Sequence, residues 1–221
     1  MRSVAPFSEP SAGGGAGLSA SINLNPPMTL AVDDVDQLRA QQYDLLAVLL
    51  GRPPGGDLLS AMAALKGGDS VLGREVAALG KAAMTTSPDE VEREYFELFV
   101  GVGRGELLPY ASYYLTGFLN ERPLARVRED FAVLGIERDE AMTEPEDHLA
   151  ILLDVMAGLA AGRFPVEGGG ERAFFLRHIA PWAERFFADL ERARAARFYR
   201  AVGALGRAFL EVEAAAFAMD A

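Results

Sequence analysis

The chain has 221 residues, half of them hydrophobic, with no cysteine and a formal net charge of −11. This size suffices for one domain with a sizeable core, and the lack of cysteine excludes a disulfide scaffold, a thiolate metal site and a cysteine nucleophile. The acidic balance argues against nucleic acid and favours a basic partner, and no stretch approaches the roughly 18 apolar residues of a membrane span.

Residues 1–27 differ in composition from the rest of the chain. They are rich in glycine, serine, alanine and proline, and contain neither a twin arginine nor a continuous apolar stretch, which argues against a signal peptide. Such a segment buries too little apolar surface to offset the entropy lost on ordering. We therefore expect a disordered tail over 1–27 and one all-helical domain over 28–221, and we hypothesise that Met28 is the biological start.

Helices separated by short breaks are predicted for the first half of the domain. Asp33 or Asp34 is placed to cap the first of them. Ser87-Pro88-Asp89-Glu90 forms a capping box, which predicts that a helix starts there and runs to Gly101. The helices expected in this half span about 34–50, 57–66, 70–83 and 88–100.

The second half continues in the same pattern. After a helix over 122–134, Thr143-Glu144-Pro145-Glu146 reads as another capping box and is expected to open a strongly apolar helix. Pro181 is expected to break or kink the next helical segment, and the last helix is predicted to bury a stripe from Phe198 to Val212. Since no strand pattern is evident, the predicted fold is an all-α bundle of roughly eight to ten helices.

A glycine run resembles a phosphate-binding loop. Gly101, Gly103 and Gly105 have the spacing of a nucleotide cradle, but they follow a helix rather than a strand, and the lysine and serine of a P-loop are absent. We interpret the run as a helix stop followed by a flexible loop.

Metal or acid–base chemistry would have to use the two histidines, His148 and His178. They are too few for a zinc or di-iron site. Asp147 adjoins His148, but neighbouring side chains on a helix diverge by about 100°. We therefore expect Asp147 to stabilise a helix start, His148 to lie at a polar rim, and His178 to form a packed, hydrogen-bonded pair with Trp182. No catalytic residue, metal or cofactor is expected.

Acidic residues gather in two places. Residues 89–97 contain five acids and one arginine, and residues 137–147 contain six acids and one arginine. Solvated helix starts would explain either cluster, because acids are favoured near a helix N-terminus. A negative rim around an apolar groove would explain both, and the sequence leaves these two interpretations open.

Three motifs resemble one family. Glu144-Pro145-Glu146-Asp147-His148 matches the E-P-x-D-H motif of the TorD/DmsD/NarJ group of redox-enzyme maturation chaperones. The segment from Tyr95 to Gly101, followed by Pro109 and Ser112-x-Tyr114, is similar to its other signature. His178-x-x-x-Trp182, with Phe198-Tyr199 downstream, is similar to its C-terminal helices. The matches follow the family order and cover about 90–212.

The resemblance implies a cytoplasmic chaperone rather than an enzyme. It would bind the twin-arginine leader or N-terminal tail of a molybdopterin-dependent oxidoreductase until the cofactor is inserted before export. Leu98, Phe99 and Pro109 would contact the apolar part of the leader. Asp147, with Glu144 or Glu146, would meet its arginines. The peptide-binding residues implied by the motifs are Tyr95, Leu98, Phe99, Pro109, Tyr110, Ser112, Glu144, Pro145, Asp147 and His148.

Several alternatives stay open at this stage. A NarJ-like assembly subunit for a non-exported molybdoenzyme is the first, and a nucleotide-binding enzyme is the second. Molybdenum-cofactor synthesis proteins are further candidate partners. The breaks at 135–145 and 162–170 would allow a domain-swapped dimer as well as a monomer. Tyr95, Gly103 and Tyr110 stand where some relatives carry tryptophan, which suggests a different client.

Overall fold

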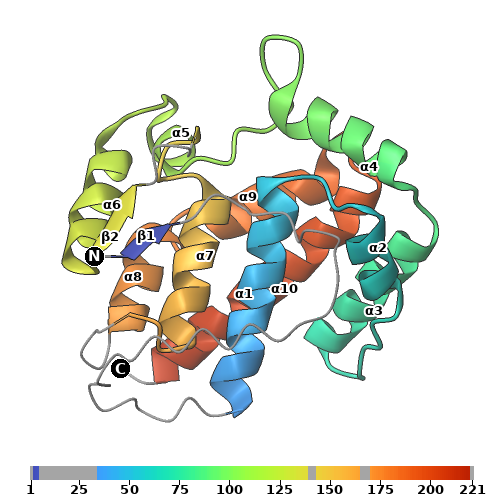
Figure 1. The fold of residues 1–221 in the computed structure, drawn as a ribbon, viewed down its shortest axis with the longest axis horizontal. Coiled ribbons are helices and arrows are strands. Elements are labelled where there is room, and N and C mark those ends of the chain that lie inside the picture. The colour runs from blue at the N-terminus through green and yellow to red at the C-terminus, as the bar shows by residue number, and fades with distance from the viewer. Residues whose placement is uncertain (1, 5–33, 139–142, 165–169, 220–221) are drawn as a thin grey trace, which may run out of the picture.

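The computed structural model describes residues 2–4, 34–138, 143–164 and 170–219, and these form ten α-helices, one π-helical segment and two short strands (Figure 1). The predicted all-α bundle of roughly eight to ten helices is confirmed. In chain order the elements are β1 (Arg2–Val4), α1 (Asp34–Gly51), α2 (Gly56–Ala63), α3 (Val71–Met84), α4 (Pro88–Tyr95), η1 (Phe96–Val100), α5 (Ala111–Thr116), α6 (Arg122–Val133), β2 (Ile136–Arg138), α7 (Leu149–Ala160), α8 (Gly170–His178), α9 (Ala183–Arg192) and α10 (Phe198–Met219).

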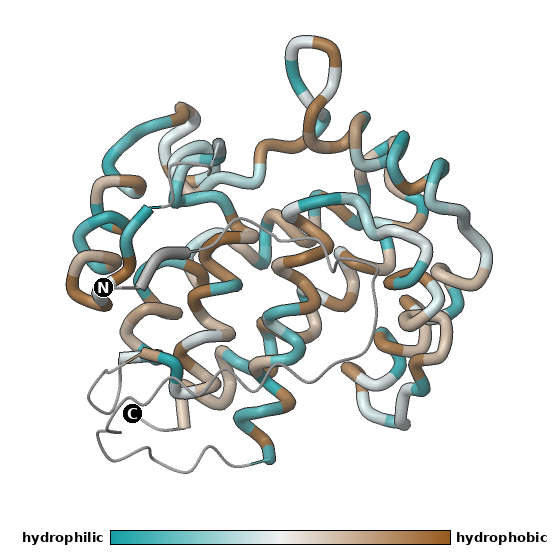
Figure 2. Tube along the Cα trace, in the orientation of Figure 1, coloured by the Kyte–Doolittle hydropathy of each residue, from teal (hydrophilic) through white to brown (hydrophobic). Residues whose placement is uncertain are grey.

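Helix α7 lies at the centre of the bundle. It packs along α1, while α10 packs against α9 and α3 (Figure 1). Eleven of its twelve residues are buried, and its trace is mostly apolar in Figure 2. A helix that is apolar all round belongs inside a core. Helix α7 is therefore a rigid support for the segment that precedes its N-terminus.

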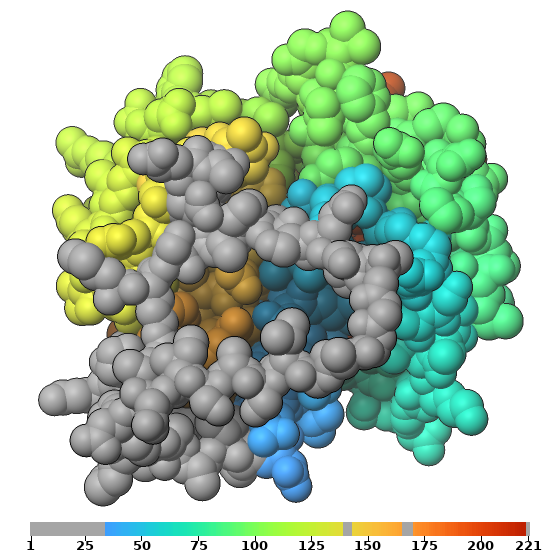
Figure 3. All heavy atoms as spheres, in the orientation of Figure 1, coloured from blue at the N-terminus to red at the C-terminus, as the bar shows by residue number. Residues whose placement is uncertain are grey.

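A smaller lobe, made of α5, α6 and β2, sits beside α7 and α8. Figure 3 shows α6 and α3–α4 on opposite sides of the face drawn, with α1 and α7 between them. The lobe is attached to α8 by stacked Phe131 and Phe174 rings, whose centroids are 6.3 Å apart. A 2.5 Å contact between His178 Nε2 and Asp130 Oδ2 adds a polar link.

The C-terminal helices follow the expected pattern with one exception. Helix α8 ends at His178 and α9 begins at Ala183, so the predicted break near Pro181 is confirmed. The expected His178–Trp182 pair also forms: the indole Nε1 donates to the His178 carbonyl over 2.7 Å. Val212, predicted to be buried, is 48% exposed, because the buried face of α10 runs through Phe209, Glu213 and Phe217 and leaves Val212 beside it.

The strands and the N-terminal region differ from the sequence prediction. Strand β1 pairs in parallel with β2, with Arg2 opposite Ile136, although no strand was expected. The rest of the predicted 1–27 tail, and Met28, lie outside the described residues, so disorder there stays a prediction. No helix among the described residues is long and apolar enough to cross a membrane.

Candidate functional site

Two segments that are far apart in sequence meet at the N-terminus of α7. The backbone N–H of Ala111 donates to the Asp147 carbonyl over 3.0 Å, and Leu149 N–H donates to the Pro109 carbonyl over 2.8 Å. These bonds make an antiparallel bridge between Tyr110 and His148. The loop before α5 and the E-P-x-D-H segment are therefore one structural unit.

The Asp147 carboxylate fastens this unit from inside. Its side chain is 1% exposed, and Oδ2 accepts a 2.8 Å hydrogen bond from the backbone N–H of Ser112, in the first turn of α5. Among the described residues, Oδ1 has no hydrogen-bond partner. Asp147 thus caps α5, although the two are far apart in the sequence. In this conformation its carboxylate cannot reach an arginine of a bound peptide.

His148 caps α7 itself. Its Nδ1 accepts a 3.1 Å hydrogen bond from Ala150 N–H, which places the proton of the neutral ring on Nε2. The ring packs edge-on against Tyr110 with centroids 5.0 Å apart. Burial lowers the pKa of His148 from 6.5 to about 4, although nearby Glu144 opposes the shift. The predicted position at a polar rim is therefore wrong, because the ring is needed as a cap.

The second predicted capping box does not form. Helix α7 begins at Leu149 rather than after Thr143. Glu146 is buried and its Oε2 pairs with Arg128 at 2.9 Å and Arg138 at 3.0 Å. Although burial favours the neutral acid, the two guanidinium groups lower the Glu146 pKa. Attraction to these arginines turns the side chain away from any cap.

Helix α4 does start with the predicted box. Ser87 Oγ accepts from Glu90 N–H at 3.4 Å, and the Glu90 carboxylate accepts from Ser87 N–H at 2.9 Å. The helix then widens into the π-helical η1, whose last turn closes with Gly101 N–H donating to the Phe96 carbonyl over 2.7 Å. Short π-helical segments are frequent at functional sites.

Three of the predicted binding residues lie on the inner side of α4–η1. Leu98 is fully buried, the Tyr95 hydroxyl donates to the Leu50 carbonyl over 3.2 Å, and Phe99 packs edge-on against Tyr199 at 5.4 Å. Burial raises the pKa of Tyr95 to about 12, so its hydroxyl stays a donor. These side chains attach the helix to the core.

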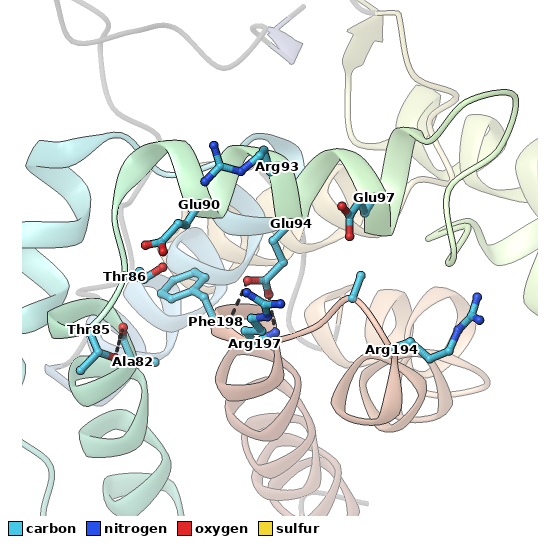
Figure 4. Close-up of a pocket in the computed structure, with 11 residues that line it drawn as sticks. Ala82, Thr85, Thr86, Glu90, Arg93, Glu94, Glu97, Arg194, Arg197 and Phe198 are labelled. Carbon is cyan, nitrogen blue, oxygen red and sulfur yellow. Dashed lines mark hydrogen bonds between the residues drawn. The ribbon is translucent and has the colours of Figure 1, made fainter.

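Two carboxylates hold the start of α10 against α4 and the following loop. Glu94 accepts from the backbone N–H groups of Arg197, Phe198 and Tyr199 at 2.8, 3.1 and 2.7 Å (Figure 4). Glu106 accepts from Arg194 and Ala195 N–H at 2.8 and 3.1 Å. Part of the acidic character predicted for 89–97 is therefore structural.

A cleft of about 570 Å³ runs between α4 and the 194–198 segment, as Figure 4 shows. A shallower hollow of about 380 Å³ lies on the outer face of α4–η1. A third depression of about 570 Å³ reaches the loop after η1. Glu97 lines all three. The hollow is lined by Asp89, Glu92, Arg93, Phe96 and Glu97.

The glycine run forms a tight turn on η1. Gly101 has φ 62°, a conformation that favours glycine. A Cβ on Gly105 would lie 2.5 Å from the Phe99 carbonyl carbon, and Leu107 N–H donates to the Leu98 carbonyl over 2.8 Å. The helix stop is thus confirmed, and the close packing leaves no phosphate cradle. Among the described residues no group of histidine, aspartate and glutamate side chains could hold a metal ion.

The predicted binding residues separate by exposure. Glu144 is exposed, while Tyr110 and Pro145 are partly exposed, and the Tyr110 hydroxyl donates to Glu144. Direct peptide contact by the buried members is incompatible with this conformation, because a backbone bridge and core packing enclose them. Those members are Leu98, Pro109, Ser112, Asp147 and His148. Sequence reasoning missed Phe96, although helical spacing sets it roughly opposite the buried Leu98.

The all-helical bundle described above is also found in a solved structure. A candidate redox enzyme maturation protein from Archaeoglobus fulgidus has this fold, with a TM-score of 0.53 and 19% identity over 79% of this chain and 94% of that chain. Residues 67–188 match the family described as nitrate reductase delta subunit. They are more than half of the chain, which therefore belongs to this family, and the resemblance found in the motifs is confirmed.

Curated relatives support the same assignment. The chaperone protein TorD of Vibrio cholerae is 31% identical over 131 residues, which are 55% of this chain and 60% of the relative. TorD of Vibrio parahaemolyticus is 29% identical over 57% of this chain and 63% of the relative. The chain thus spans less than two thirds of the length of these relatives.

Proposed function

We propose that this protein is a maturation chaperone and not an enzyme. It binds the twin-arginine leader, or an equivalent N-terminal tail, of a molybdopterin-dependent oxidoreductase in the cytoplasm, and holds it until the cofactor is inserted. The observation that carries the proposal is the bridge between Tyr110 and His148. This bridge joins both motif segments, and both lie within residues 67–188, which match the family. Relatives to which the chain is similar are named chaperones.

The predicted binding residues have different roles according to whether they are buried or exposed. The buried Asp147, His148 and Ser112 position the surface, while Tyr110, Glu144 and Pro145 present it. A leader begins with basic residues and continues with apolar ones, so an acidic surface next to apolar side chains suits both parts. The net charge of −11 adds long-range attraction for a basic segment.

A second candidate is an assembly subunit for a redox enzyme that is not exported. The family description, nitrate reductase delta subunit, favours it specifically. A subunit of this kind would stay bound to the mature enzyme, whereas a leader-binding chaperone would leave once the leader is released. Stoichiometric recovery with mature enzyme would therefore favour the second candidate.

Calorimetric titration with synthetic leaders from the host's molybdoenzymes tests the first candidate. Saturable binding to one leader, weakened by added salt, is expected because exposed charge pairs are screened. Asp147→Ala should weaken this binding by loosening the Tyr110 loop. The absence of binding to every leader would contradict the proposal.

A further inference from the structure

We propose that the outer hollow of α4–η1 is the subsite that receives an arginine of the client peptide. The inference rests on the proposed function and moves the contact away from Asp147. The hollow has about 380 Å³ and Phe96, which is 45% exposed, is one of the residues that line it. An exposed phenylalanine ring beside carboxylates is complementary to a side chain that is both cationic and partly apolar.

The charges of the hollow suit a cation. The hollow is lined by three carboxylates, those of Asp89, Glu92 and Glu97, and by one guanidinium, that of Arg93, so two negative charges are in excess. Arg93 forms no ion pair with these carboxylates, and Figure 4 shows Arg93 and Glu97 projecting to different sides of the helix. Glu97 makes no side-chain hydrogen bond with another described residue, so its carboxylate is available.

Arginine fits this hollow better than lysine. Its planar guanidinium can stack on the Phe96 ring while its N–H groups meet a carboxylate in a fork, a combination that a compact ammonium group does not provide. The stem of the side chain can lie along the ring. Val100, which is 51% exposed, ends η1 after Phe96, and Val102, which is 98% exposed, follows in the next loop. They suit the apolar residues that follow the basic start.

Two other carboxylates of α4 already accept hydrogen bonds within the protein, so they are not available to bind an arginine of the peptide. Glu94 binds three backbone N–H groups of the α10 start, and Glu90 is held by Ser87. In the E-P-x-D-H segment, Glu146 is paired with Arg128 and Asp147 is buried. Glu144 is exposed but accepts from the Tyr110 hydroxyl. The carboxylates that line the same hollow as the exposed Phe96 are those of Asp89, Glu92 and Glu97.

The test is a double-mutant cycle read by calorimetry on the full chain. Leader peptides and their Arg→Gln forms are titrated into wild type, Glu92→Gln/Glu97→Gln and Phe96→Ala. The control Glu75→Gln/Glu211→Gln removes the same charge from other exposed or half-exposed positions. We expect about fivefold weaker leader binding for each hollow variant, unchanged binding for the control, and little further loss when the Arg→Gln peptide meets Glu92→Gln/Glu97→Gln.

Different failures have different meanings. If the hollow variants bind the leader as tightly as wild type, the subsite is wrong while leader binding stands. If losses in peptide and protein simply add, the arginine binds elsewhere and the subsite is again wrong. If the wild type binds no leader, both the proposed function and the subsite are wrong.

Discussion

The Asp147 carboxylate and the backbone N–H of Ser112 are joined by a 2.8 Å hydrogen bond across 35 positions of the chain. Both residues are buried, at 1% and 0% exposed. The bond ties the start of α5 to the start of α7 and so fixes the Tyr110 loop between them.

Asp147→Ala should therefore lower the free energy of unfolding by about 1–3 kcal/mol, because Ser112 N–H loses its partner in a buried place. Asp147→Asn keeps an acceptor and should recover most of the loss. Urea denaturation measures both, with the exposed Glu211→Ala as a control expected to match wild type. Equal losses for Asp147→Ala and Asp147→Asn would show that charge, and not the hydrogen bond, is what matters.

His148 predicts how stability depends on pH. Its folded pKa of about 4 lies below the ordinary 6.5, so the unfolded chain binds the proton more readily between these values. Stability present above pH 6.5 should fall as the pH drops to 4, by roughly 3 kcal/mol from this group.

The variant His148→Asn isolates that contribution. Asparagine can still cap α7 but does not titrate. The difference in unfolding free energy between wild type and variant should therefore change between pH 7 and pH 4, to the disadvantage of wild type. A difference that stays constant with pH would contradict the assigned burial of the neutral ring.

Loss of the Glu94 carboxylate should lower the free energy of unfolding far more than loss of the exposed Glu92 carboxylate. Removing its carboxylate by Glu94→Ala leaves three backbone N–H groups of the α10 start without a partner, at a cost of about 2–4 kcal/mol. Glu92→Ala, two residues away on the exposed face, should leave the denaturation midpoint unchanged. Similar midpoints for both variants would mean that Glu94 does not hold α10.

The two capping-box sequences show what the sequence can and cannot predict. At Ser87 the partners lie within one turn, so local chemistry decides the structure and the prediction was correct. At Thr143 the same pattern failed, because Glu146 is attracted to Arg128 and Arg138 from other elements. Periodicity likewise predicted the buried face of α7, but not that all of its faces would be covered.

The sequence predicted the segments that make up the candidate site but not the exposure of their side chains. The motifs indicated which segments belong together, and the Tyr110–His148 bridge joins them. Exposure depends on distant packing, so the sequence could not show that Asp147 and His148 point inward. It also could not show that the outer face of α4–η1, with Phe96, stays uncovered.

Gly105 offers a test of the loop that follows η1. A Cβ there would meet Leu98 O at 2.6 Å and the Phe99 backbone at 2.5 Å, so Gly105→Ala should destabilise the protein by about 1–3 kcal/mol. Gly68→Ala is the control, since its Cβ would meet nothing within 4 Å. Thermal unfolding compares the two, and an unaffected Gly105→Ala would mean that the loop is not seated on η1 as described.

Co-expression with a client tests whether the chain recognises a leader in the cell. Each molybdoenzyme of the host would be produced with and without its N-terminal leader, together with the tagged chain, and captured at matched expression levels. If the chain binds a leader, one client co-purifies in near-stoichiometric amount when it carries its leader and is lost when the leader is removed. Equal recovery of the two forms would contradict leader binding and favour an assembly subunit that recognises the folded enzyme.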